Sequence, residues 1–206
     1  AVTAADRLPC RLPLGGFCLL LVAFAQSPPV VPPRDSVSGL AVAHLYARVL
    51  RLHGDSSKAV AGIENYVSSV APALRQQGGY AGARLLVDRE HGNSMSVSFW
   101  QDEAAARASE AAMSAVRRDA VSAFGAEDPV SEYFEVLLQH RPLPTEAGHW
   151  VRVTNLSGDP AKVDDGVAHY KAQTIPAVEQ LAGFRATVLF ADRTAGKSMI
   201  VTVWTT

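Results

Sequence analysis

The sequence predicts an α+β protein built from two tandem ferredoxin-like units of the order β-α-β-β-α-β, the second of them incomplete. Residues 46–102 match residues 150–206 without a gap at 20 of 57 positions. A fixed internal spacing of this kind indicates that one structural unit was duplicated. Within a copy, a first strand is followed by a helical segment and a hairpin, the order typical of the ferredoxin-like motif.

In the first copy, residues 43–50 are expected to form a strand and residues 57–77 a helix. A Gly-Asp turn separates the two segments and supplies the helix N-cap. Pro72 lies inside this helix, and Pro176 takes the same place in the second copy. Because proline lacks the backbone donor and clashes with the preceding turn, we expect the helix to kink or restart there.

A β-hairpin follows, with strands expected at residues 80–89 and 94–100. A second, alanine-rich helix begins near Gln101 and runs to about Val121, and its acidic start suits the helix dipole. A last strand is expected at residues 131–140. This order completes one ferredoxin-like unit.

Along the third strand of each unit, apolar side chains alternate with polar ones. A sheet with helices on one face must also cover its other face, and two such sheets can cover each other. Either face can be the one turned to the interior that the two sheets share. One candidate set for the shared interior comprises Met95, Val97, Phe99, Met199, Val201 and Val203.

The chain therefore divides into residues 40–140 as the first repeat, 141–148 as a linker and 149–206 as an incomplete second repeat. After Trp204 the second copy shows no counterpart of the second helix and last strand. We expect this incomplete copy to present a free sheet edge and an uncovered apolar surface.

Residues 1–39 belong to neither repeat. The apolar run 12–25 follows two arginines and is too short to span a bilayer as a helix. It is either a secretory signal peptide, as the small residues before Gln26 favour, or a non-native or disordered extension with a proline-rich linker. We expect a cytoplasmic protein, or an exported one if residues 1–25 are a true signal peptide.

The net charge is −1, and the two cysteines, Cys10 and Cys18, both lie before the repeats. A chain without a basic surplus is not expected to bind nucleic acid. The repeats hold no cysteine metal site, and the motifs of metalloproteases, phosphate-binding loops and serine hydrolases do not occur. We therefore expect no metal and no cofactor.

Two segments of the first copy, 72–89 (PALRQQGGYAGARLLVDR) and 96–106 (SVSFWQDEAAA), resemble the antibiotic biosynthesis monooxygenase (ABM) domain. The second copy shows the resemblance at residues 176–187 and 201–204. The resemblance implies the dimeric α+β barrel, in which two ferredoxin-like units pack sheet to sheet. In this chain the tandem copies would build the barrel.

The wider superfamily includes cofactor-free oxygenases of aromatic polyketides, haem-degrading enzymes and proteins of no known activity. Trp100 and Trp204 match its strand tryptophan. In the polyketide oxygenases an asparagine partners that tryptophan, whereas Ser96 and Ile200 stand four residues earlier here. The second helix of the first copy has no tryptophan or histidine, so haem cleavage is not expected.

The candidate catalytic residues are side chains that recur in both copies and could hold an aromatic substrate. An arginine could stabilise a phenolate or enolate oxygen, a tyrosine could reach a pocket, and a tryptophan could stack on a ring. Each also has a structural interpretation, as a salt bridge with Asp88 or Asp192 or as core packing. The candidates are Arg48, Tyr66, Trp100, Arg152, Tyr170 and Trp204.

Two functional hypotheses follow. The first is a cofactor-independent monooxygenase that oxidises an aromatic or quinol-type small molecule with O2. The second is a non-catalytic barrel that binds a small hydrophobic ligand or serves an assembly role. In both, the partner is a small aromatic or hydrophobic molecule, no membrane is involved in the mature form, and further oligomerisation is compatible with the fold.

Overall fold

The computed structural model describes residues 17–22 (backbone only), 45–127 and 129–205. Its strands, in chain order, are β1 (Phe17–Val22), β2 (Tyr46–His53), β3 (Tyr80–Val87), β4 (Asn93–Trp100), β5 (Ser131–His140), β6 (Trp150–Ser157), β7 (Phe184–Asp192) and β8 (Lys197–Trp204). Its α-helices are α1 (Ala59–Asn65), α2 (Ala71–Arg75), α3 (Glu103–Phe124), α4 (Val163–His169) and α5 (Ile175–Glu179).

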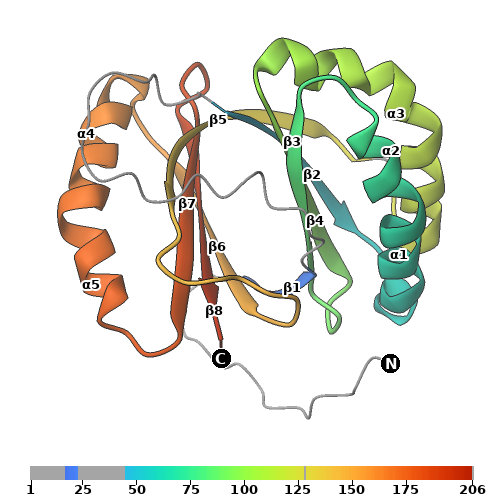
Figure 1. Cartoon of the computed structure of the whole chain (residues 1–206), viewed down its shortest axis with the longest axis horizontal. Helices are drawn as coiled ribbons and strands as arrows, with labels where there is room; N and C mark the ends of the chain where they lie inside the picture. Colours follow the sequence, from blue (N-terminus) through green and yellow to red (C-terminus); the bar gives the residue numbers. More distant parts are fainter. Residues whose placement is uncertain (1–16, 23–44, 128, 206) are drawn as a thin grey trace.

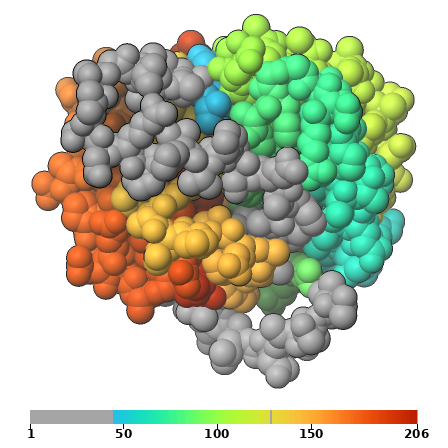
Figure 2. Space-filling model, in the orientation of Figure 1, coloured from blue at the N-terminus to red at the C-terminus, as the bar shows by residue number. Residues whose placement is uncertain are grey.

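The eight strands close one barrel in the order β1-β3-β4-β2-β5-β7-β8-β6, and all neighbours are antiparallel. Two β-α-β-β units form most of it: β2 to β4 in the first, and β6 to β8 in the second. Helices α1 to α3 flank the barrel on one side and α4 and α5 on the opposite side (Figure 1). The space-filling view shows the same separation of the two helical flanks (Figure 2). The predicted α+β class and β-α-β-β order are confirmed.

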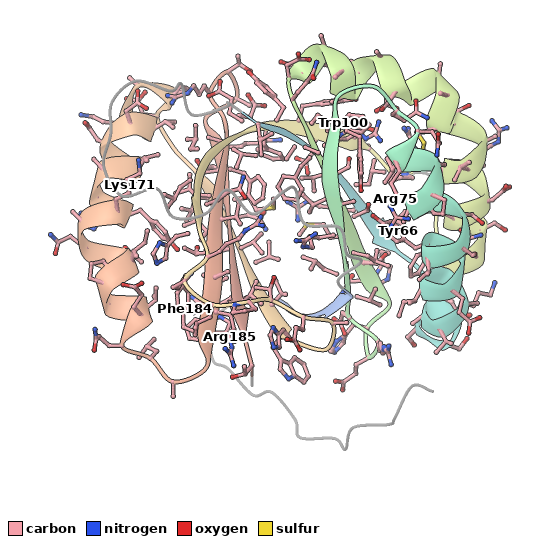
Figure 3. The ribbon with its side chains drawn as sticks, in the orientation of Figure 1. Tyr66, Arg75, Trp100, Lys171, Phe184 and Arg185 are labelled. Carbon is pink, nitrogen blue, oxygen red and sulfur yellow. The ribbon has the colours of Figure 1, made fainter. Side chains whose placement is uncertain are left out.

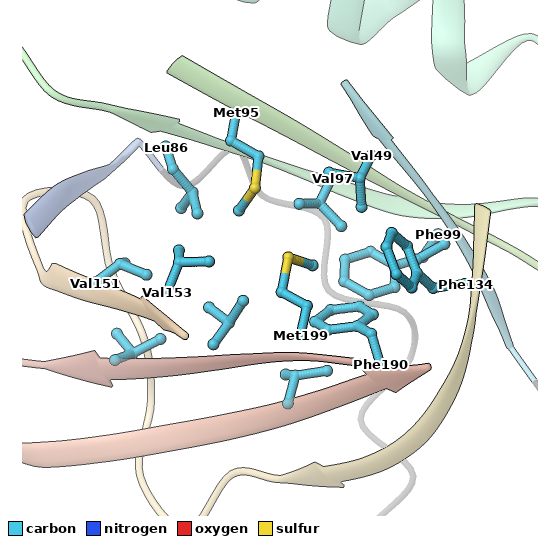
Figure 4. Close-up of a cluster of buried hydrophobic side chains, with 14 of the residues drawn as sticks. Val49, Leu86, Met95, Val97, Phe99, Phe134, Val151, Val153, Phe190 and Met199 are labelled. Atoms are coloured by element: carbon cyan, nitrogen blue, oxygen red, sulfur yellow. The ribbon is translucent and has the colours of Figure 1, made fainter. Parts of the chain in front are cut away.

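Apolar side chains from both units fill the barrel interior. Met95 and Met199 face each other from opposite sheets, and Phe99 lies near Phe190 (Figure 4). All six residues of the candidate interior set belong to this core, which settles which face of the sheet points inward. The opposite face of the first unit packs against α1 to α3 in a second core, which contains Tyr66 and Trp100.

The first helix of each unit restarts at its proline, as expected. In the first unit a π-helical turn (Tyr66–Val70) separates α1 from α2, which begins one residue before Pro72. The second unit repeats this arrangement with a π-helical turn at Tyr170–Thr174. A wider turn accommodates the ring and the missing donor without ending the helix.

Some boundaries differ from those predicted. Strand β2 continues to His53, because its last residues pair with the start of β4. Helix α3 begins after Asp102, whose carboxylate accepts a hydrogen bond from the Ala105 amide at 2.7 Å, and it ends at Gly125, whose φ of 61° is left-handed. Leu45 of the predicted first strand lies just before β2, and residues 43–44 lie outside the described residues.

The prediction that the second unit has a free sheet edge is wrong for the edge formed by β6. Residues 17–22, which the sequence placed in an extension outside the repeats, form β1, and this strand pairs with β6 on one side and β3 on the other. The rest of residues 1–39 lies outside the described part. No helix among the described residues is long and apolar enough to cross a membrane.

Candidate functional site

Arg48, the first predicted site residue, is held in a buried network below α3. Only 2% of the residue is exposed. Its Nη1 donates to Ser109 Oγ at 2.8 Å and to the Ala106 carbonyl at 3.3 Å, and it lies 3.3 Å from a carboxylate oxygen of Glu110. The predicted ion-pair partners Asp88 and Asp192 are wrong, because both carboxylates instead accept backbone amides of their hairpin turns.

Glu110 gathers four partners at the centre of this network. Tyr133 Oη donates to it at 2.5 Å and Ser131 Oγ at 3.1 Å, and Arg117 pairs with its other oxygen. Partial burial raises the pKa of Glu110. The hydrogen bonds from Tyr133 and Arg117 and the charges of Arg117 and Arg48 outweigh that effect and lower the pKa to about 2. Glu110 is therefore an anion that neutralises Arg48.

Trp100 lies beside Arg48 with 0% exposure. Its indole N–H donates to Ser98 Oγ at 2.9 Å, and that hydroxyl donates in turn to the Arg48 carbonyl at 3.4 Å. The Arg48 guanidinium carbon lies 5.1 Å from the centre of the indole ring, and Tyr80 contacts the ring edge-on. These contacts fix the indole between the sheet and the helices.

Tyr66 is also buried, with its hydroxyl accepting a hydrogen bond from Ser96 Oγ at 3.3 Å. Burial raises the pKa of this phenol to about 12, so it stays neutral at physiological pH. Tyr66 and Trp100 lie on the helix-facing side of the first sheet (Figure 3). The structure thus brings Arg48, Tyr66 and Trp100 into one packed layer, and neither of the two clefts identified below is lined by any of them.

The second unit repeats the hydrogen bond of its tryptophan, gives its tyrosine a different partner, and leaves its arginine exposed. Trp204 donates to Thr202 Oγ1 at 3.0 Å, and Tyr170 Oη lies 2.7 Å from Thr187 Oγ1. Arg152 is exposed and has no ion pair among the described residues. In the first unit α3 covers the equivalent position, whereas no described helix takes that place in the second unit.

A cleft of about 1300 Å³ runs along the outer side of β5, between α3 and the β7–β8 hairpin. Tyr46 and Tyr133 provide aromatic surface, and the Arg107 guanidinium stacks 4.1 Å from the Tyr133 ring centre. Its charged lining consists of Arg51, Glu103, Arg107, Glu127, Glu132, Glu135, Asp192, Arg193 and Lys197. Five of these nine side chains are carboxylates.

The cations of this cleft are neutralised by their neighbours. Arg107 pairs with Glu103 at 2.5 Å, and Arg193 pairs with Glu135 at 2.9 Å. The pKa of Tyr46 is raised, first by burial and then by the charges of Glu135 and Glu103. Burial is the largest cause of this shift, and the two carboxylates add to it.

A second cleft, of about 500 Å³, lies at one mouth of the barrel. Arg51 crosses it: its guanidinium donates to Glu132 at 3.0 Å and to Asn155 at 2.9 Å, and reaches the sulfurs of Met95 and Met199 at 3.5 and 3.3 Å. Arg51 and Asn155 are equivalent positions of the two copies, 104 residues apart. Arg51 therefore joins the units across their approximate two-fold axis.

Sequence reasoning missed Arg51, Glu110 and the carboxylates around Tyr46. The spacing of Glu103, Arg107 and Glu110 places them on one face of a helix, which was the available signal. Among the described residues, no three histidine, cysteine, aspartate or glutamate side chains gather as a metal site would require.

No protein-family model matches the sequence. The uncharacterized protein Rv2557 of Mycobacterium tuberculosis H37Rv is 32% identical over 167 residues, which cover 81% of this chain and 73% of that protein. The chain belongs to the Rv2557 family. Rv2558 of the same organism, also uncharacterized, is 31% identical over 151 residues, or 73% of this chain and 64% of that protein.

Solved structures share the fold of this Rv2557 relative. A "putative monooxygenase" of Fusobacterium nucleatum superposes with a TM-score of 0.59 at 15% identity, over 80% of this chain and 77% of that one. An "anthrone oxidase-like protein" gives 0.56 at 14% identity, over 81% and 75%. These likenesses show an ABM-like fold, in agreement with the sequence resemblance, and at such identities they show the fold alone.

Proposed function

We propose that this protein is a barrel that binds a small aromatic molecule in the cleft along β5, without chemistry at the Arg48–Trp100 layer. The observation that carries the proposal is the contrast between the buried Arg48–Trp100 layer and the open cleft along β5. Arg48 and Trp100 are 2% and 0% exposed. Arg48 contacts Glu110 and Ser109, and the Trp100 indole N–H donates to Ser98. The cleft is open and offers both aromatic and charged surface.

The charges of the cleft favour a ligand with a cationic group. Its arginines are already paired with carboxylates, so an anionic ligand would have to displace Glu103 or Glu135. The lining holds five carboxylates and four basic side chains, so a small negative surplus remains after this pairing. An ammonium beside Tyr46 would gain from that surplus and from the face of the aromatic ring. A planar ring in the same molecule would cover the tyrosine surface.

The binding test compares three probes of similar shape: phenethylamine, the neutral 2-phenylethanol and the anionic 3-phenylpropionate, by calorimetry. We expect the amine to bind most tightly. Glu135→Gln is expected to weaken the amine about tenfold and to leave the alcohol unchanged, because only the amine needs the carboxylate charge. Glu90→Gln, in an exposed turn outside the cleft, is the matched control. Equal affinity of all three probes, or no binding at millimolar concentration, would contradict the proposal.

A second candidate, oxygenation of an aromatic substrate, is favoured by the second unit. Its exposed Arg152 lies on the same sheet face as Tyr170 and Trp204, so an anionic substrate oxygen could reach it. The substrate would reduce O2, one oxygen atom entering the product and the other leaving as water. Incubation with anthrone under O2 tests this: we expect quinone formation that Arg152→Gln reduces and Arg75→Gln does not. Absence of quinone above the buffer rate rules this candidate out.

A further inference from the structure

At one mouth of the barrel, polar side chains continue the inward-facing columns of the strands. Along β6 the interior core ends at Val153 and Asn155 follows it, and on β8 Lys197 precedes the core residue Met199. Arg51 is the equivalent of Asn155 in the first unit. These strand ends surround the cleft of about 500 Å³ that Arg51 crosses. A polar rim above an apolar interior is typical of a small-molecule site.

The charge of this cleft is opposite in sign to that of the cleft along β5. Among the described residues of its lining, the basic side chains are Arg51 and Lys197 and the one carboxylate is Glu132. Four carboxylates that line only the β5 cleft are absent from it, those of Glu103, Glu127, Glu135 and Asp192. Glu132 lies 3.0 Å from Arg51 Nε and 3.7 Å from Lys197 Nζ. Because one carboxylate cannot neutralise two cations, the lining keeps a positive surplus and attracts an anion.

The terminal nitrogens of Arg51 have weak acceptors. Nη1 contacts the sulfur of Met95 at 3.5 Å, and Nη2 donates to Asn155 Oδ1 at 2.9 Å and contacts the sulfur of Met199 at 3.3 Å. A thioether is a weak acceptor, and Glu132 takes only the Nε–H. An oxyanion at Nη1 would form a charge-assisted hydrogen bond, about twice as strong as a neutral one. Arg51 can therefore bind an anion without leaving Glu132.

The walls of the cleft add hydrocarbon surface. Its apolar lining consists of Leu52, Met95, Phe134, Val153 and Leu156. The unbranched side chain of methionine adapts readily to the shape of a ligand. A volume of about 500 Å³ also suits a small organic molecule better than a bare inorganic ion. The ligand should therefore carry a short hydrocarbon chain as well as a negative group.

We propose that this cleft binds a small aliphatic carboxylate, with its oxygens at Arg51 Nη1 within reach of Lys197 and its chain against Met95 and Phe134. Asn155 accepts from Nη2 and so orients the guanidinium toward the ligand. Lysine suits the second contact because its flexible stem lets the ammonium follow the carboxylate. The site is separate from the one proposed for an aromatic amine along β5, and its ligand has the opposite charge.

The three methionines of the chain report on this site. Met95 lines the cleft and Met199 contacts the same guanidinium, whereas Met113 belongs to the core between the first sheet and its helices. Met95 and Met199 face each other across the barrel interior (Figure 4). In a chain with isotope-labelled methionine methyl groups, millimolar hexanoate should shift the NMR signals of Met95 and Met199 along one saturation curve. The Met113 signal should stay in place.

Three related probes define the ligand class. Hexanol lacks the charge and acetate lacks the chain, so each should bind at least about tenfold more weakly than hexanoate. Hexylamine, with the opposite charge, should not shift Met95. Equal affinity of hexanol or acetate would overturn the proposal, because the site would then read only the chain or only the charge. Absence of a Met95 shift with hexanoate would also overturn it.

Variants of the rim test the charges. Glu132→Gln should tighten hexanoate binding and Lys197→Gln should weaken it, each by about fivefold, because they change the surplus in opposite directions. Lys162→Gln, on an exposed lysine outside the cleft, is the matched control for Lys197→Gln. Weaker binding in Glu132→Gln, or equal effects of the two lysine variants, would contradict the site.

Asn155→Asp tests the role of Arg51 without removing it. The new carboxylate would pair with Nη2 and cancel the positive surplus, so the guanidinium stays in place while hexanoate binding falls at least about tenfold. The methionine signals of this variant, without ligand, show whether the barrel is intact. Binding of hexanoate at wild-type affinity by an intact Asn155→Asp barrel would overturn the proposal.

Discussion

At the scale of single residues, Glu110 neutralises the buried charge of Arg48. A buried guanidinium without a counter-ion would be strongly unfavourable, so the cluster of Glu110, Ser109 and the Ala106 carbonyl stabilises the native state more than it prepares a reaction. Arg152 is the counterpart of Arg48 in the second unit; it is exposed and lacks such partners among the described residues.

Replacement of Glu110 measures this role. We expect Glu110→Gln to lower the free energy of unfolding by about 2 kcal/mol, because hydrogen bonds to charged groups are lost and Arg48 keeps a buried charge. Glu103→Gln, which breaks an exposed helix pair, should cost at most about 0.5 kcal/mol. Urea denaturation of the two variants compares them, and equal losses would contradict the assignment.

The same carboxyl predicts a pH dependence. The pKa of Glu110 falls from the ordinary glutamate value of 4.5 to about 2 in the folded chain, so folding favours the ionised form. This contribution is fully present above the unfolded pKa and is lost as the pH falls from about 5 toward 2. The wild type should therefore lose more stability than Glu110→Gln over that range, as urea titrations at several pH values would show. Parallel curves would argue that Glu110 is not held as an anion.

At the scale of elements, the hairpin turns are tied to the loop after the first strand in both units. The Gly54 amide donates to the Gly92 carbonyl, and the Gly158 amide to the Gly196 carbonyl, both at 2.9 Å. Gly92 has a φ of 73°, and a Cβ there would lie 2.1 Å from the Gly54 carbonyl oxygen. This contact explains why both copies keep glycine at the turn.

We expect Gly92→Ala to cost about 2–3 kcal/mol, from left-handed strain and a backbone clash that no side chain can relieve. Gly78→Ala is the matched control, since a Cβ at Gly78 meets nothing within 4 Å. The control should be neutral or slightly stabilising. Thermal unfolding of the two variants compares them, and a Tm of Gly92→Ala within a degree of wild type would contradict this account.

At the scale of the whole molecule, the barrel interior couples the two units. Met95, Val97 and Phe99 pack in one core with Phe190 and Met199, so neither sheet can bury its inner face alone (Figure 4). Arg51 adds a polar connection across the barrel mouth. The chain should therefore unfold as one cooperative body.

A cavity at Met199 tests that coupling. Met199→Ala should lower the unfolding free energy by about 2–5 kcal/mol and reduce hydrogen-exchange protection in the strands of both units. Ile200→Ala, on the opposite and more open face of β8, should act less and only in the second unit. Loss of protection confined to β6–β8 in Met199→Ala would show that the units unfold independently.

Much of this fold could be predicted because it follows from short-range patterns in the sequence. The alternation along β4 and β8 and the prolines of the first helices act through neighbouring residues, and the 104-residue period presents the same local patterns twice. The sequence offered the set from Met95 to Val203 as one candidate for the interior, and the core of the barrel confirms it. The candidate site was less predictable, because recurrence marks Arg48, Trp100 and Tyr66 without showing whether a helix covers them.

The sequence by itself determined the unit, its element order and the residues that recur. Only the tertiary structure decided which face points into the barrel, that Glu110 neutralises Arg48, and that residues 17–22 form a strand between β3 and β6. The reason is physical: periodicity reports which side chains share a face, whereas burial, ion pairing and strand pairing depend on segments far apart in the chain. Strand β1 has no counterpart in either repeat, so pairing alone reveals its place.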